Sequence, residues 1–220
     1  MKPKTGSIDN ILFDLDGTLT DPREGIVNSI LFALKKLGIN ENNIHELDSF
    51  IGPPLRDSFR KRYNLALETA ATAVSYYSEY YSVKGIFECK LYPGIAELLE
   101  SLSSRGYKLF VATSKPTQYA KEVLEHFKIQ TYFEEIIGSN FDNTRTDKTE
   151  IIAYIILEYG LIPGRTVMIG DTKYDIIGAK NNAIKSIGVN NGYGTQEELL
   201  SSHPDFAVNN CHQIGSLFIK

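Results

Sequence analysis

Hydrophobic residues along the chain follow two kinds of pattern. Mainly apolar runs of the length expected for buried strands occur at residues 8–13, 108–112, 133–137, 166–169, 185–189 and 206–208. From about residue 95 onwards these runs alternate with stretches in which apolar residues recur every three or four positions, which is typical of amphipathic helices. Strands separated by helices predict an α/β fold with a doubly wound parallel sheet.

The interval between the first two of these strands has a different pattern. Its apolar spacing is helical throughout, with Pro22 and Pro54 placed where helices begin. It predicts helices at about 22–38, 44–50, 54–63 and 65–83. We therefore expect a small helical domain at residues 21–87, inserted into an α/β core made of residues 1–20 and 88–220.

The first predicted strand ends on two acidic residues, Asp14 and Asp16, followed by Gly17. Side chains two positions apart in an extended chain face the same way, so the two carboxylates project together. Because they repel each other and resist burial, they are costly as pure structure, and a divalent cation is the simplest partner that would hold them. The alternative is an acidic turn with no chemical role.

Polar residues also follow two later strands, and ligand sites in parallel sheets lie at such carboxyl ends. Thr113 and Ser114 could bind phosphate together with free amides at a helix start, or could simply cap that helix. Asp171 and Asp175 stand four residues apart across another strand end and helix start. A helix dipole accounts for an acid such as Asp175 but less easily for Asp171.

Composition places few further limits on function. The chain is 42% hydrophobic and 23% charged with a net charge of −4, so no basic surface points to nucleic acid or an anionic membrane as partner. Cys89 and Cys211 lack the spacing of a zinc site or a disulfide framework. The sequence shows neither the apolar core of a signal peptide nor an apolar run of membrane-spanning length, so we expect a cytoplasmic protein.

The stretch around Asp14 and Asp16 resembles the first motif of the haloacid dehalogenase (HAD) superfamily, in its phosphatase branch. Thr113, Lys148 and Asp171 match the second, third and fourth motifs in the same order. The resemblance covers the first strand and residues 108 to about 195. It implies a Rossmann-like core with a helical cap, and an enzyme of the phosphoglycolate phosphatase-like or 5′-nucleotidase-like group.

The resemblance also implies a role for each matched residue. Asp14 is expected to be the nucleophile and Asp16 the general acid/base, with Thr113 and Ser114 contacting phosphate. Mg²⁺ would be bound by Asp14, by the backbone carbonyl of Asp16 and by Asp171. The remaining acid of the predicted metal set, Asp175, would orient a metal-bound water or the lysine.

One departure leaves the identity of the lysine open. Many phosphatase relatives carry Lys-Pro at the third motif, whereas this chain has Lys148 followed by Thr149. Arg145 is therefore a rival for the role of Lys148.

The function expected from these residues is Mg²⁺-dependent hydrolysis of a small phosphomonoester through an aspartyl-phosphate, with phosphoglycolate or a nucleoside 5′-monophosphate as substrate. A sugar-phosphate mutase uses the same residues, and a phospho-accepting receiver-type signalling module also binds magnesium. The acid two positions after the nucleophile and the helical insertion argue against the receiver. A catalytically inactive binding protein is a third alternative.

Two further segments have a predicted role. Selectivity for the alcohol should come from the helical insertion, where Arg56 could bind a substrate carboxylate or second phosphate, or could be a solvated surface residue. The glycine-rich segment 188–194 lacks the Lys-Ser/Thr of a P-loop, which favours a structural turn. The sequence is compatible with a monomer or a dimer.

Overall fold

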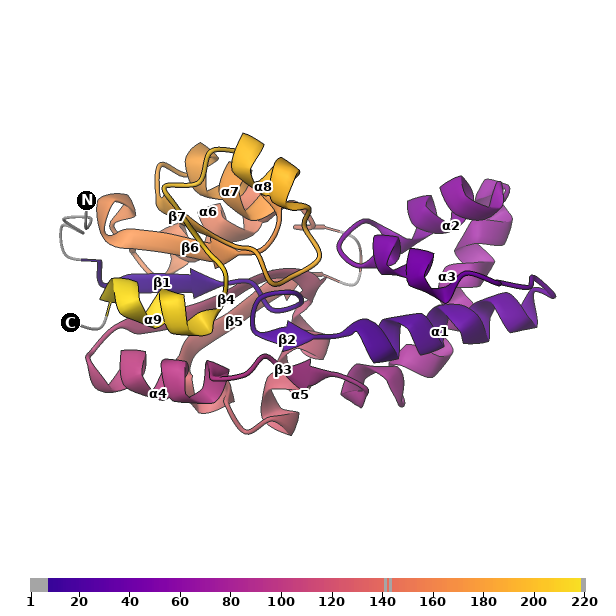
Figure 1. The fold of residues 1–220 in the computed structure, drawn as a ribbon, viewed down its shortest axis with the longest axis horizontal. Helices are drawn as coiled ribbons and strands as arrows, with labels where there is room; N and C mark the ends of the chain where they lie inside the picture. Colours follow the sequence, from indigo (N-terminus) through magenta and orange to yellow (C-terminus); the bar gives the residue numbers. More distant parts are fainter. Residues whose placement is uncertain (1–7, 141, 143, 219–220) are drawn as a thin grey trace. The chain divides into compact units, whose positions relative to one another are not determined.

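The computed structural model describes residues 8–140, 142 and 144–218. Parallel strands form a sheet in the order β5-β4-β1-β6-β7-β8 (Figure 1). The strands are β1 (Asn10–Phe13), β4 (Lys108–Pro116), β5 (Phe133–Ser139), β6 (Thr166–Gly170), β7 (Lys185–Val189) and β8 (Phe206–Val208). The predicted α/β fold with a doubly wound parallel sheet is therefore confirmed.

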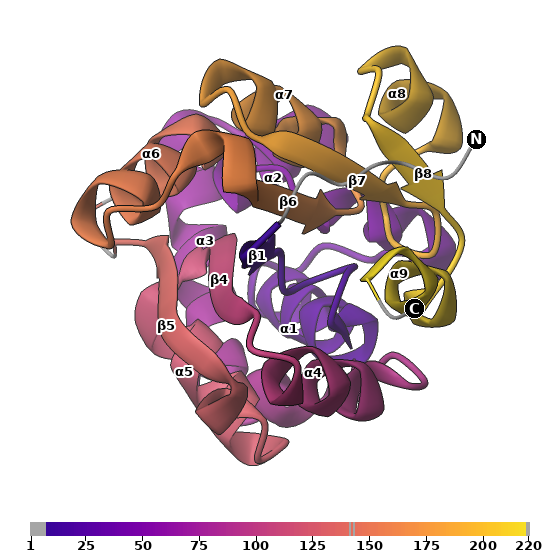
Figure 2. The same ribbon diagram turned by 90° about the vertical axis from the view of Figure 1, so that its left-hand side faces the viewer.

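Helices cover both faces of this sheet. One face carries α6 (Lys148–Glu158), α7 (Lys173–Asn181) and α8 (Gln196–Ser201), and the other carries α4 (Ile95–Ser104), α5 (Thr117–His126) and α9 (Cys211–Phe218), as Figures 1 and 2 show from two sides. Short 3₁₀ turns lie at η3 (Gln130–Tyr132) and η4 (Pro163–Arg165). Both faces of the central strands are thereby covered, which explains why consecutive residues within each of them are apolar.

The core under α6 is built from the middle of the sheet. Leu12 of β1, Phe110 of β4 and Met168 of β6 are almost completely buried, and they pack with Ile151 and Ile155 of α6. Burying each such side chain contributes roughly 1.5–3 kcal/mol to stability.

The register of these strands brings three chain segments to one edge. Phe13, the last residue of β1, lies beside Val111 of β4 and Ile169 of β6. The amide of Asp14 then donates a hydrogen bond to the carbonyl of Ile169 at 2.9 Å. Residues that follow β1 and β6, and those in the second half of β4, therefore gather at the carboxyl edge of the sheet.

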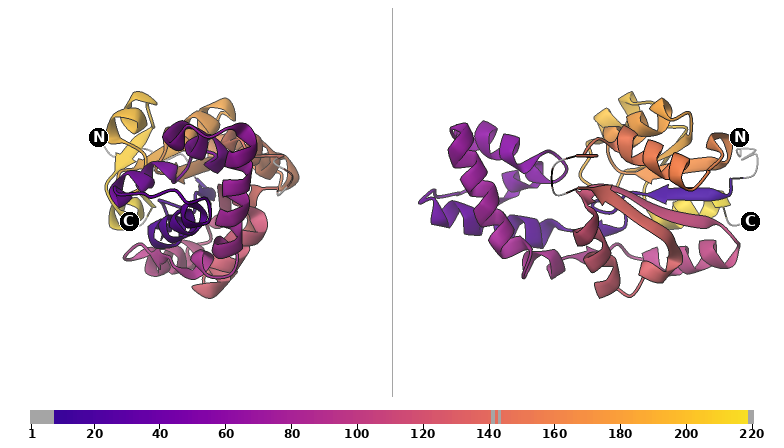
Figure 3. Two further views of the ribbon diagram at one scale, coloured as in Figure 1. Left: turned by 90° about the vertical axis from the view of Figure 1, so that its right-hand side faces the viewer. Right: turned by 180° about the vertical axis from the view of Figure 1, so that it is seen from behind.

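The chain divides into two compact units, Met1–Thr20 with Leu91–Lys220, and Asp21–Lys90. The second unit contains the helices α1 (Arg23–Lys36), α2 (Leu55–Tyr63) and α3 (Leu67–Tyr81) and the 3₁₀ segments η1 (Ile44–Phe50) and η2 (Gly85–Phe87), seen from two further sides in Figure 3. Its buried aromatic residues include Phe50 and Phe59, whose rings meet edge to face at 5.1 Å. A two-stranded sheet, β2 (Thr20–Asp21) with β3 (Lys90–Leu91), lies where the chain passes from one unit to the other.

Candidate active site

Asp14 lies directly after β1 and is held by two donors. Its Oδ1 accepts a hydrogen bond from the amide of Leu15 at 2.7 Å and forms an ion pair with Lys148 Nζ at 2.9 Å. The residue is only 8% exposed. A buried carboxylate in one fixed orientation at a strand end is suited to attack a bound electrophile, because no rearrangement has to precede the reaction.

Lys148 is the first residue of α6, and its ammonium lies at the carboxyl edge of the sheet. It contacts Asp14 at 2.9 Å and Asp175 at 2.8 Å, and it donates a hydrogen bond to the carbonyl of Ala112 at 2.9 Å. Burial alone would favour the neutral amine, but the charges of Asp14 and Asp175 outweigh it and raise the pKa of Lys148. The lysine is therefore a fixed positive charge in the site.

Asp175 belongs to the first turn of α7 and forms a capping box with Thr172. Its Oδ2 accepts hydrogen bonds from the amide of Thr172 at 3.0 Å and from the hydroxyl at 2.7 Å, while Oδ1 faces Lys148. Burial raises the pKa of Asp175 even though Lys148 opposes that effect. Because both oxygens have partners, Asp175 is placed to orient Lys148.

Asp171 follows β6 and is surrounded by backbone and by one hydroxyl. Thr18 donates to Oδ1 at 3.1 Å, and the amides of Tyr193 and Gly194 approach Oδ2 at 2.7 and 3.4 Å. Burial, followed by the negative charges of Asp14 and Asp175, raises the pKa of Asp171 to about 7. These donors, one hydroxyl and two backbone amides, are all neutral. They stabilise the carboxylate by hydrogen bonds but do not balance its negative charge.

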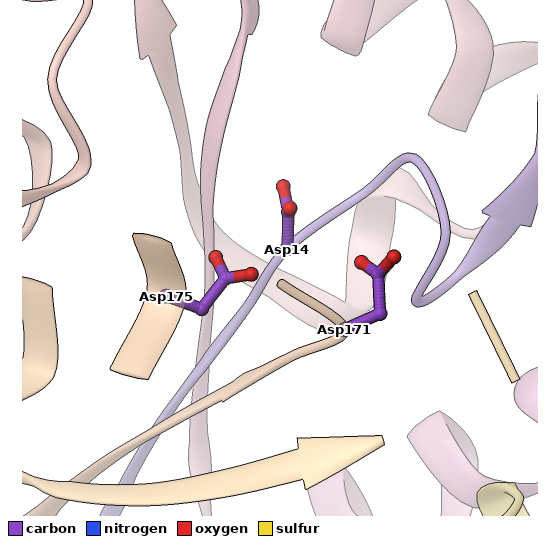
Figure 4. Close-up of side chains that lie close together, drawn as sticks. All are labelled: Asp14, Asp171 and Asp175. Carbon is purple, nitrogen blue, oxygen red and sulfur yellow. The ribbon is translucent and has the colours of Figure 1, made fainter. Parts of the chain in front are cut away.

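These residues form a cluster that fits a divalent cation. One oxygen from each of Asp14, Asp171 and Asp175 lies within 4.8 Å of the others, and Figure 4 shows the three side chains close together. Three buried acids and one ammonium leave an excess of negative charge when all are ionised. Carboxylate oxygens are the ligands that Mg²⁺ prefers, and a bound cation would offset both the burial of the Asp171 charge and its repulsion by Asp14 and Asp175, which together raise the pKa of Asp171.

Asp16 points to a different partner, which the sequence analysis did not identify. Its Oδ2 forms an ion pair with Lys115, whose side chain is 6% exposed, and its Oδ1 accepts a hydrogen bond from Thr20 at 3.3 Å. The only sequence signal for Lys115 was its place directly after Thr113 and Ser114 at a strand end. The side chain of Asp16 therefore lies in a second charged pair rather than in the cluster of three acids.

The structure places the remaining predicted residues as follows. Thr113 is buried in β4, where its hydroxyl accepts a hydrogen bond from the amide of Lys115 at 3.3 Å, and Ser114 is exposed. Arg145 donates to the carbonyl of Gly138 at 3.0 Å and stacks on Tyr154. Those contacts hold Arg145 at the loop after β5, whereas Lys148 contacts the acids.

Comparison with known proteins agrees with this site. Residues 11–189 match the model of the haloacid dehalogenase-like hydrolase family. A 5′-nucleotidase of Pseudomonas aeruginosa is 47% identical over 195 residues, which cover 89% of this chain and 88% of that protein. A phosphoglycolate phosphatase of Vibrio parahaemolyticus is 27% identical over 212 residues and 93% of each chain.

A solved structure agrees as well. A predicted phosphatase from Clostridium acetobutylicum superposes with a TM-score of 0.90 at 42% identity, covering 97% of this chain and 99% of that one. The chain therefore belongs to the haloacid dehalogenase-like hydrolase family. Within that family it is a phosphatase, as the motif resemblance predicted. Among the described residues, no helix is both long and apolar enough to span a membrane.

Proposed function

We propose that the chain is a Mg²⁺-dependent phosphomonoesterase that forms an aspartyl-phosphate on Asp14. The observation that carries this proposal is the placement of Lys148 between Asp14 and Asp175. A carboxylate about 4 Å from a dianionic phosphate is repelled by roughly 8 kcal/mol at an effective dielectric constant near 20. The Lys148 ammonium offsets part of this repulsion and holds the nucleophile in place.

In the first step an oxygen of Asp14 forms a bond to phosphorus while the bond from phosphorus to the alcohol oxygen breaks. Asp16, in its protonated form, gives its proton to that oxygen, because an alkoxide is a poor leaving group. In the second step Asp16 takes a proton from water, whose oxygen attacks phosphorus. The bond between phosphorus and Asp14 then breaks, which releases inorganic phosphate and restores the carboxylate.

The metal would be held by Asp14, Asp171 and the backbone carbonyl of Asp16, and it would supply positive charge next to the phosphoryl oxygens. The hydrogen bonds of Asp175 to Thr172 and its ion pair with Lys148 support a role beside the metal rather than on it. Thr113, at the same sheet edge, and the exposed Ser114 are the proposed hydroxyl contacts to the phosphoryl group.

For the substrate, similarity favours nucleoside 5′-monophosphates over phosphoglycolate. The relative named 5′-nucleotidase is 47% identical to this chain, against 27% for the relative named phosphoglycolate phosphatase. Both classes are small phosphate esters and make the same demand on Asp14 and Asp16. The difference between them lies in the alcohol, which the catalytic carboxylates do not recognise.

The test is release of inorganic phosphate from a panel of nucleoside 5′-monophosphates, phosphoglycolate, sugar phosphates and pyrophosphate, with Mg²⁺. We expect a nucleoside 5′-monophosphate to give the highest kcat/KM and Asp14→Asn to lower it by more than about 10²-fold. Asp9→Asn is the matched control, since Asp9 forms its ion pair with Arg165 outside the cluster. Activity near the wild-type level in Asp14→Asn would overturn the proposal, and an isomerised sugar phosphate without free phosphate would show a mutase.

A further inference from the structure

The glycine-rich segment after β7 closes around the carboxylate of Asp171. The predicted structural turn does occur here, and its backbone amides bind an acid of the chain itself. The amides of Tyr193 and Gly194 both point at Oδ2 of Asp171, at 2.7 and 3.4 Å. A Cβ atom on Gly192 would lie 2.1 Å from the same oxygen, so only glycine allows the backbone to come this close.

A second segment, the loop after β1, also lies against this carboxylate. The hydroxyl of Thr18, which is 1% exposed, donates to Oδ1 at 3.1 Å. Gly17 has a φ of +89°, and a Cβ there would lie 2.3 Å from Oδ2. Asp171 is thus enclosed by the loop after β1 and by the loop after β7, and it cannot rotate without displacing one of them.

The count of hydrogen bonds on each oxygen determines what Asp171 can still offer. A carboxylate oxygen has two lone-pair sites. Oδ2 accepts from two amides and is therefore occupied, whereas within the described part of the chain Oδ1 accepts one hydrogen bond, from Thr18, and keeps one site. Mg²⁺ takes six ligands in a strict octahedron, while Ca²⁺ takes six to eight and often binds both oxygens of one carboxylate.

We propose that Thr18 and the segment Gly192–Gly194 are positioning residues that restrict Asp171 to one donor oxygen and so favour Mg²⁺ over Ca²⁺. This inference rests on the proposed function, because it assumes that the cluster of Asp14 and Asp171 binds a divalent metal. It adds a determinant of metal selectivity in a loop far along the chain from the catalytic aspartates.

The test is isothermal titration of chelator-treated, gel-filtered protein with Mg²⁺ and with Ca²⁺, which measures both affinities without reference to activity. Gly192→Ala should push Asp171 or the loop away, loosen the carboxylate, and lower the ratio Kd(Ca²⁺)/Kd(Mg²⁺) by about fivefold or more relative to wild type. Gly164→Ala is the matched control, because a Cβ at Gly164 meets nothing within 4 Å. It should leave the ratio unchanged.

A second pair of variants guards against misfolding of Gly192→Ala. Thr18→Val removes the hydroxyl at nearly constant volume and should lower the ratio in the same direction, whereas Thr18→Ser, which keeps the hydroxyl, should not. If the ratio is unchanged in folded Gly192→Ala and Thr18→Val, the inference about metal selectivity is wrong, and the proposed function is unaffected. If wild-type protein binds neither ion, the inference fails together with the metal part of the proposed function. If wild-type protein binds the metals but hydrolyses no substrate of the panel, the proposed function is wrong, and the titrations still decide the inference.

Discussion

Lys115 forms an ion pair with Asp16 at the carboxyl edge of the sheet, and both side chains are largely shielded from water, at 6% and 21% exposed. A lysine is buried in this way only when a partner offsets the loss of hydration. Thr20 holds the other oxygen of the same carboxylate at 3.3 Å. The proposed acid/base residue is therefore oriented by two side chains, separately from the Asp14 cluster.

This pair predicts a selective effect of Lys115→Met. Without the ammonium, Asp16 loses its orientation toward the departing oxygen, so kcat/KM for a nucleoside 5′-monophosphate should fall about 10–10²-fold. The value for p-nitrophenyl phosphate should stay within about threefold, because p-nitrophenolate leaves without a proton and kcat/KM covers the reaction only through departure of the alcohol. Lys115→Arg should recover part of the loss. Equal losses on both substrates would make Lys115 a structural residue.

Asp16→Asn should separate the two steps of the proposed reaction. An amide cannot activate the water that hydrolyses the aspartyl-phosphate, yet a good leaving group such as p-nitrophenolate can still depart. We therefore expect a phosphorylated enzyme to accumulate from p-nitrophenyl phosphate, detected in the intact mass after acid quenching. The double variant Asp14→Asn/Asp16→Asn is the control and should take up no phosphate. Normal turnover of Asp16→Asn would disprove the acid/base role.

The environment of Asp171 predicts how stability depends on pH when metal is removed. Its pKa is raised from 3.8 to about 7 in the folded chain by burial and by Asp14 and Asp175. A raised carboxyl pKa means that the folded state binds the proton more tightly, so the contribution of Asp171 to stability is fully present below about pH 4 and is lost as the pH rises through about 7. In a chelator, Asp171→Asn should therefore raise Tm at pH 8, where wild-type Asp171 is ionised and repelled.

The same variant should show little gain in Tm near pH 4, where wild-type Asp171 is protonated. Thermal melts at the two pH values, with and without Mg²⁺, measure this difference. Saturating Mg²⁺ should reverse the order at pH 8, because the metal stabilises only the chain that binds it. A gain of equal size at both pH values would show that repulsion at Asp171 is not the cause.

The sequence predicted the sheet and the cluster of acids because both depend on local signals. Mainly apolar runs mark the buried strands, and parallel pairing puts the residues after Phe13 and Ile169 at one edge whatever the details of packing. Asp14 and Asp171 could be placed at the same sheet edge for that reason, whereas their shared metal site was implied by the family resemblance. The position of the Lys148 ammonium is harder to predict from local signals, because it depends on where α6 begins.

What the sequence did not predict depends on contacts between distant segments. The pairing of Lys115 with Asp16 spans 99 positions, and nothing in either segment alone indicates it. The enclosure of Asp171 by Gly17 and Gly192 likewise requires loops from opposite ends of the chain to meet. A glycine-rich segment has the same sequence pattern whether its amides bind a phosphate, water or a carboxylate.

Selectivity for the alcohol is the subject of the last prediction, because the proposed catalytic residues act only on the phosphoryl group. Arg56 lies on the first turn of α2 and is exposed, so its guanidinium can offer two parallel hydrogen bonds to an anionic group of a substrate. Arg56→Ala should raise KM for phosphoglycolate, whose carboxylate is a second anionic group, several-fold and leave kcat within about threefold, since only binding common to ground and transition states is lost. Kinetics with p-nitrophenyl phosphate, which lacks a second anionic group, should be unchanged.

Lys61→Ala, which removes an exposed cation from the same helix, is the matched control and should change neither substrate. It separates a specific contact of Arg56 from a general effect of positive charge on α2. If Arg56→Ala and Lys61→Ala raise KM equally, long-range attraction explains the effect, and raising the salt concentration should abolish it in both. If Arg56→Ala changes no kinetic constant, Arg56 is a surface residue and the selectivity of the enzyme resides in other side chains.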